Sequence, residues 1–245
     1  MIDKKLLSSI IDKYYLKGLC DSVIWKIKDN NLIINFITKN SDMIGRLEAS
    51  NFPLKDTELA IYDTSLLDRQ LQITSGNINL DVISKGKINT KLVLSDAQFN
   101  IQFSLADTSL IPAVGEVVEP ELYQVVADLD FEAISAMIRA KNALPKINTV
   151  IFNIDKNLDG GYNLVVNFGD INDYSNRISY DINSVEVQGI VDLNVIFNSD
   201  LLKEVLDANK GASSAQMSIF DKGLIKLEFV DETVSSLYYL VCKEK

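Results

Sequence analysis

An internal repeat limits the possible folds of this chain more than any other feature of its sequence. Residues 61–71 read IYDTSLLDRQL, and residues 196–206 read IFNSDLLKEVL. Three more pairs of segments match in the same order, namely 23–27 with 150–154, 31–36 with 163–168, and 84–88 with 221–225. The repeat predicts two similar domains, and similar domains placed side by side often build symmetric objects such as closed rings.

Length and composition are those of a packed globular protein with a strongly acidic surface. The 245 residues suffice for two domains of ordinary size, and 47% of them are apolar. The net charge is −10, from 24 basic and 34 acidic side chains. A uniformly acidic surface repels DNA and anionic membranes, so any role with nucleic acid requires basic residues concentrated on one face.

Several classes of function are excluded by residues that the sequence lacks. The chain has no histidine, which excludes serine–histidine and cysteine–histidine catalysis and zinc sites that use imidazole. Its two cysteines, Cys20 and Cys242, are interpreted as buried free thiols in a reducing compartment. The N-terminus does not resemble a signal peptide, and no apolar run has the ~18 residues of a membrane span. We expect a soluble protein of the cytoplasm, or of the host cytoplasm if the chain is viral.

Periodicity predicts the same order of elements in each copy. Apolar residues three and four positions apart predict helices over 4–16 and 65–73 in the first copy, and over 131–143 and 200–209 in the second. The expected N-caps are Asp63 or Thr64, Asp130 and Ser199. Strands are predicted near 21–28, 31–38, 42–49, 57–62, 77–84, 87–94 and 98–105, and again near 148–154, 162–168, 176–182, 190–197, 215–220, 223–230 and 234–242.

These elements predict an α+β fold of two similar domains, each with two helices packed on antiparallel sheets. The first domain is expected over 1–106 and the second over 122–245, joined by a connector at 107–121. The connector is unusually apolar, although linkers are normally polar. Two interpretations remain open, because the connector either packs on a domain or lines a docking surface.

No segment has the pattern of a catalytic or cofactor site. Neither a phosphate-binding glycine loop nor a nucleophile elbow occurs. The string Asp155–Gly160 has the first spacings of a calcium loop, but Val166 stands where a bidentate glutamate is required. We interpret this string as a polar hairpin turn. We therefore expect no metal, no cofactor and no enzymatic activity.

The four helical windows 3–17, 65–75, 131–146 and 200–210 are weakly basic within an acidic chain. They carry ten basic and seven acidic residues, so 10 − 7 = +3, against 14 − 27 = −13 for the rest. This contrast has two interpretations, contact with a polyanion or an ordinary mixed surface. The ten basic residues are Lys4, Lys5, Lys13, Lys17, Arg69, Arg139, Lys141, Lys146, Lys203 and Lys210.

Three short segments add a resemblance to a known family. They are LAIYD at 59–63, VVEPEL at 117–122 and LYYL at 237–240, and they accompany the repeat and the basic helices in the same order. Over essentially its whole length the chain resembles the DNA sliding clamps, and most closely the short trimeric clamp of T4-type bacteriophages. That resemblance implies a duplicated clamp fold and a polymerase processivity factor without catalytic activity.

The resemblance also implies partners and site residues. Three chains would close a ring whose helices face duplex DNA through the ten basic residues, bound without regard to base sequence. The strand near 98–105 would pair with a strand near 177–183 of the next subunit. A DNA polymerase and an ATP-dependent clamp loader would insert apolar peptides at the connector. The residues implied for that pocket are Leu110, Ile111, Pro112, Val114, Leu240 and Val241.

Two other functions remain open at this point. One is a monomeric processivity subunit of the same fold that binds DNA directly on one face. The other is a duplicated β-rich structural protein of a virion.

Overall fold

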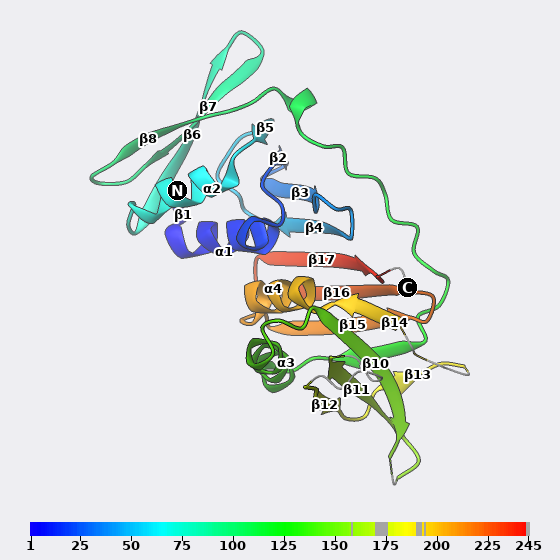
Figure 1. Ribbon diagram of the computed structural model, residues 1–245. Coiled ribbons are helices and arrows are strands. Elements are labelled where there is room, and N and C mark those ends of the chain that lie inside the picture. Colours follow the sequence, from blue (N-terminus) through cyan, green and yellow to red (C-terminus); the bar gives the residue numbers. More distant parts are fainter. Residues whose placement is uncertain (158, 170–175, 190–192, 194, 244–245) are drawn as a thin grey trace. The chain divides into compact units, whose positions relative to one another are not determined.

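The computed structural model describes the chain except for residues 158, 170–175, 190–192, 194 and 244–245. The chain forms two compact units (Figure 1). The first comprises Met1–Gly115 with Glu232–Ser236, and the second comprises Glu116–Asp231 with Leu237–Lys245. Among the described residues, every helix is too short or too polar to cross a bilayer.

The first unit contains two helices and two groups of antiparallel strands. Strands β5, β2, β3 and β4 lie side by side in that order, and β1, β6, β7 and β8 form a four-stranded sheet. Helix α1 packs on α2 and on β4. The bounds are β1 Ile2–Asp3, α1 Lys4–Tyr15, β2 Val23–Lys28, β3 Asn31–Ile37, β4 Met43–Ala49, β5 Thr57–Ile61, α2 Thr64–Gln72, β6 Asn77–Lys85, β7 Ile88–Ser95 and β8 Asn100–Ser104, with 3₁₀ turns η1 at Leu16–Gly18 and η2 at Thr108–Leu110.

The second unit repeats this plan. Strands β13, β9, β15, β16 and β17 lie side by side, and β12, β11, β10 and β14 form a four-stranded sheet. Helix α3 packs on α4, β11 and β12, and α4 packs on β10 and β14. The bounds are β9 Val125–Asp128, α3 Phe131–Ala143, β10 Thr149–Lys156, β11 Tyr162–Phe168, β12 Ile178–Ile182, β13 Glu186–Val187, β14 Val195–Asn198, α4 Ser199–Asn209, β15 Ser214–Phe220, β16 Leu224–Val230 and β17 Val234–Val241.

The α+β class and the two helices of each copy are confirmed. The strands β1, β9 and β13 were not predicted, and part of the predicted strand 190–197 lies outside the described residues. Asp155 and Lys156 end β10, which pairs with β11 as a hairpin, so the calcium-like string lies at a turn as predicted.

The helices begin where polar side chains bind their first free N–H groups, which would otherwise lack partners. The Asp63 carboxylate accepts from Leu66 N, and the Asp130 carboxylate accepts from Ala133 N, both at 2.7 Å. The prediction of Ser199 as a cap was wrong. Asn198 caps α4 instead, and Ser199 is its first helical residue.

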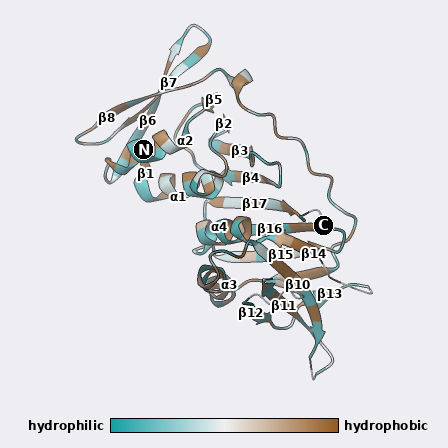
Figure 2. Cartoon of the chain, viewed as in Figure 1, coloured by the Kyte–Doolittle hydropathy of each residue, from teal (hydrophilic) through white to brown (hydrophobic). Residues whose placement is uncertain are grey.

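Apolar side chains fill the space between helices and strands. Buried and more exposed residues alternate along β2, as expected of a strand with one face in a core, and the hydropathy colouring also changes along the strands (Figure 2). On β3, the buried Phe36 packs its ring 6.5 Å from that of Tyr14 on α1. On β4, the neighbour of Phe36 is Gly45, which leaves room for the ring. This contact helps to fix α1 on the strands of its unit.

Candidate nucleic-acid interface and partner pocket

In the first unit, four of the basic residues predicted to bind DNA remain at or near the surface of the helix layer. Lys5, Lys17 and Arg69 are exposed. The Arg69 guanidinium also bonds to the backbone oxygen and the hydroxyl of Ser65, one turn earlier in α2. Lys4 is half-buried, and its ammonium donates to the carbonyl oxygens of Gln72 and Thr74 at 2.9 and 2.6 Å. Lys4 therefore joins α1 to the end of α2.

In the second unit, Arg139, Lys146 and Lys210 are exposed. Lys210 lies 3.5 Å from Asp207, and the half-buried Lys203 lies 2.6 Å from Glu204. A lysine that already has a carboxylate neighbour contributes little net positive potential. Of the predicted residues in this unit, Arg139 and Lys146 are therefore the exposed ones that form no ion pair with a described residue.

Two of the ten predicted residues are placed inside the protein. Lys13 is 4% exposed and Lys141 is 3% exposed. The Lys141 ammonium lies 2.8 Å from the Asp200 carboxylate, and it donates to the carbonyl oxygen of Pro145 at 3.3 Å. Neither lysine presents its charge to an external phosphate. The ion pair of Lys141 links the end of α3 to the start of α4. Helical spacing could have predicted the burial of Lys141, because this residue follows the buried Met137 by one turn and so lies on the same face of α3.

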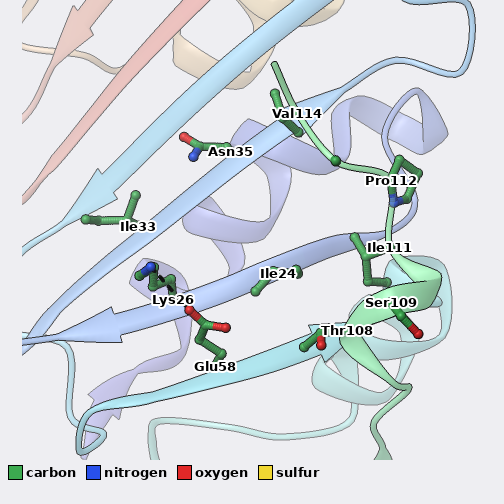
Figure 3. A pocket seen from close by; sticks show the side chains of 11 residues that line it. Ile24, Lys26, Ile33, Asn35, Glu58, Thr108, Ser109, Ile111, Pro112 and Val114 are labelled. Atoms are coloured by element: carbon green, nitrogen blue, oxygen red, sulfur yellow. Dashed lines mark ion pairs between the residues drawn. The ribbon is translucent and has the colours of Figure 1, made fainter. Parts of the chain in front are cut away.

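A cavity of about 450 Å³ lies between the connector and the outward face of β2, β3 and β5 in the first unit (Figure 3). Ile111 on the connector lies beside Ile24 on β2, and Ile33 on β3 adds a further apolar wall. The lining also includes the half-exposed ion pair of Lys26 and Glu58 at 3.2 Å. An apolar pocket with a few polar groups at its rim suits a short peptide that inserts one apolar side chain.

The six predicted partner residues divide into three groups. Ile111, Pro112 and Val114 line this connector pocket. Leu110 points into a second cavity, described below. On β17, Leu240 is buried and Val241 is exposed, and neither lines the connector pocket.

Sequence reasoning missed the strand residues of the pocket, above all Ile24 and Ile33. Their neighbours Val23, Trp25 and Leu32 are buried, so alternation turns both isoleucines toward the opposite face. An apolar residue on the outward face of a half-buried strand is the signal that indicates such a pocket.

The second cavity, of about 360 Å³, lies beside strand β8. Its walls include Tyr62 just before α2, Leu66 on α2, Phe103 from β8, and Leu110 from turn η2. Strand β8 ends its sheet, and no other strand among the described residues pairs with its outer side. An apolar cavity next to an unpaired strand edge is a template for another chain.

The other end of the connector is held within the second unit by a group of polar side chains. The Glu119 carboxylate accepts hydrogen bonds from the hydroxyls of Tyr239 and Tyr123, and it lies 3.3 Å from the Lys226 ammonium. The Tyr239 bond, aided by Lys226, holds the pKa of Glu119 below its usual value. Burial, followed by the Glu119 carboxylate, raises the pKa of Tyr239. The connector thus has one anchor at Ile111 and another at Glu119.

Comparison with known proteins gives agreement in structure without close agreement in sequence. No protein-family model matches the chain, and no curated protein matches it. The proliferating cellular nuclear antigen of Entamoeba histolytica superposes with a TM-score of 0.75 at 12% identity, over 99% of this chain and 96% of that one.

Two further structures superpose with similar TM-scores. The PCNA2–PCNA3 complex of Sulfolobus tokodaii gives a TM-score of 0.72 at 12% identity, over 99% of this chain and 98% of that one. The A. fulgidus PCNA, solved with the C-terminal region of FEN-1 bound, gives 0.75 at 16% identity, over 100% and 97%. Both units and their order are therefore shared with these structures, and the chain has the fold of the sliding clamps.

Proposed function

We propose that this chain is a DNA sliding clamp, a processivity factor whose copies form a ring around duplex DNA and hold a replicative polymerase on it. The observation that carries the proposal is a pair of strand edges on a duplicated clamp fold, β8 in the first unit and β12 in the second. Each ends its sheet, and no other described strand pairs with its outer side. The chain itself is proposed to have no catalytic activity. Its sequence has no histidine, which excludes serine–histidine and cysteine–histidine catalysis.

Assembly is proposed to occur by pairing β8 of one copy with β12 of the next. Each edge has exposed apolar side chains on an adjoining helix, Leu66 on α2 beside β8 and Phe131, 69% exposed, on α3, which packs on β12. Because the two edges differ, the contact is head-to-tail, and such contacts close into rings when the rotation between copies permits it. We expect three copies, as in the trimeric clamps that the sequence resembles.

DNA contact is proposed for the exposed basic residues Lys5, Lys17, Arg69, Arg139, Lys146 and Lys210. Lysine and arginine bind phosphate independently of base sequence, and such contacts weaken as salt increases. A clamp needs no more than this, because encirclement provides retention. The buried Lys13 and Lys141 are left out of the proposed contact set, as are Lys4 and Lys203, which are half-buried.

The first prediction is that the assembled protein stays on circular DNA and leaves linear DNA. The protein is diluted until its copies separate, mixed with nicked circular duplex and concentrated again, so that rings re-form around DNA. After gel filtration in about 0.5 M salt, where contacts between exposed charges are largely screened, we expect protein on circles but not on circles cut once. Equal binding to both forms would favour the monomeric DNA-binding subunit, and no binding to either would favour the virion protein.

A charge-reversed variant shows whether the helices form the DNA surface. The pair Lys5→Glu and Arg139→Glu is compared with Lys85→Glu and Lys87→Glu at the tip of the β6–β7 hairpin, which changes net charge equally. For short linear duplex at low salt, the dependence of log affinity on log salt is expected to fall by about one per lost phosphate contact in the helix variant only. Equal slopes for both variants would contradict the assignment.

The connector pocket is proposed to bind peptide segments of the polymerase and of an ATP-dependent clamp loader. Its occupant would insert one apolar side chain among Ile24, Ile33 and Ile111, with hydrogen-bonding groups toward Lys26 and Glu58. Both charges of that pair are about half exposed, so a peptide can approach them without losing the whole ion pair.

The third prediction tests this pocket without a known partner. A random peptide library on phage is selected on the natural chain, and the selected clones are then tested on Ile33→Asp. We expect the enriched peptides to share an apolar residue and to bind the variant at least about tenfold more weakly, because a carboxylate in the pocket would be desolvated. Ile88→Asp, at an exposed hairpin position, is the control. Peptides that bind Ile33→Asp as well as the natural chain would show that this pocket is not the site.

A further inference from the structure

The turn η2 lies between the two cavities of the first unit and contributes to both. Leu110, 63% exposed, lines the cavity beside β8. The next residue, Ile111, is 8% exposed and lines the connector pocket together with Thr108 and Ser109. Adjacent residues of one turn therefore contact the proposed assembly face and the proposed partner pocket.

Hydrogen bonds make this turn a short rigid unit. The Asp107 carboxylate accepts from Ser109 N at 2.9 Å and from the Ser109 hydroxyl at 2.7 Å. Leu110 N donates to Asp107 O at 3.0 Å, and Ile111 N donates to Thr108 O at 3.2 Å. A displacement of Leu110 therefore moves the backbone that carries Ile111.

Covering the cavity beside β8 would remove the Leu110 side chain from water and restrict its motion. In the free chain this side chain has solvent on one side, and nothing among the described residues covers it from there. A second copy seated on the β8 edge would supply that cover. The turn would then be held from both sides, and the connector residues after it would lose freedom.

We propose that turn η2 couples assembly of copies to the order of the connector pocket, with Leu110 as the contact on the assembly side and Ile111 as the contact on the pocket side. This inference rests on the proposed assembly through β8. Coupling between sites is reciprocal, so a peptide in the connector pocket would also strengthen assembly. A closed ring would then bind partners better than its separated copies.

The test measures hydrogen exchange of peptides covering residues 107–115 in the full chain, above and below the concentration at which copies separate. In the natural chain we expect exchange to slow by on the order of fivefold or more on assembly. Asp107→Ala keeps Leu110 but loses the two hydrogen bonds that the Asp107 carboxylate accepts from Ser109. It should assemble within about twofold of the natural chain and show the same exchange in both states.

Two further variants separate the role of Leu110 from general weakening of assembly. Leu66→Ala removes a different side chain from the same cavity, so raising its concentration should restore both assembly and slowed exchange. Leu110→Ala should also assemble when its concentration is raised, but hydrogen exchange of residues 107–115 should not slow when it does. Assembly of the natural chain with unchanged connector exchange would overturn the coupling and leave the proposed clamp intact. A chain that stays single at every concentration would overturn both.

Discussion

A chain with Leu66→Asp is expected to remain a single copy at concentrations where the natural chain assembles. Leu66 is 39% exposed on α2 and lines the cavity beside β8, so the unassembled chain tolerates the substitution. In the assembled state the new carboxylate would be buried without a partner, which costs several kcal/mol. At 1.4 kcal/mol per tenfold, a cost of about 3 kcal/mol weakens assembly by at least about 100-fold. Sedimentation velocity over a concentration series measures this shift directly.

Because the proposed contact is head-to-tail, a substitution on the opposite edge should also block assembly. Phe131→Asp should block assembly from the other side of the contact, and it should fold well because an acidic residue is favourable in the first turn of a helix. Each variant keeps one natural edge, so a mixture of Leu66→Asp and Phe131→Asp should form dimers through a single intact contact. The mixture should form nothing larger.

Ile88→Asp is the control for a charge placed on an exposed apolar residue, since Ile88 lies at the β6–β7 tip and does not line the cavity beside β8. It should assemble as the natural chain does. If Leu66→Asp also assembled normally, or if the mixture of variants stayed monomeric, the β8–β12 contact would be wrong.

The regular elements were predictable because their patterns are local and occur twice. The two turns of apolar spacing in α3 and the polar residue before it depend on no distant contact. Strands β9 and β13 lack such a signal, since β13 has two residues and β9 has four. Strand β9 forms because it pairs with β15, whose partner residues lie about ninety positions later in the chain. Short strands that depend on long-range pairing contain too few residues for a periodic pattern to predict them.

The candidate sites were predictable only in part, for a related reason. Counting charges by helix treated Lys141 as a surface residue, although its position relative to Met137 places it on the buried face. The resemblance to the sliding clamps implied Ile111 and Val114 as pocket residues, and both line the cavity at the connector. The strand residues opposite them were missed because their side chains meet the connector only after the chain has folded.

Gly45→Ala is expected to destabilise the first unit, because the position has no room for a methyl group. A Cβ built at Gly45 lies 2.2 Å from the Phe36 ring, which is buried and packs against Tyr14 of α1. Either the ring leaves its rotamer or the strands separate, and overpacking of this kind costs about 1–3 kcal/mol. Thermal unfolding followed by circular dichroism should show a fall of several degrees. Hydrogen exchange should increase in α1, since Phe36 helps to fix that helix.

A double-mutant cycle with Phe36→Leu separates this clash from other effects of alanine in a strand. Leucine lacks the ring atoms nearest Gly45, so Gly45→Ala should cost less in the Phe36→Leu background than in the natural chain, with an interaction of about 1 kcal/mol or more. Gly211→Ala is the matched control, because a Cβ there meets nothing within 4 Å. It should be neutral or stabilising by less than about 1 kcal/mol through the unfolded chain. If the changes in the free energy of unfolding caused by Gly45→Ala and Phe36→Leu were strictly additive, the Phe36 ring would not be the reason that glycine is required at position 45.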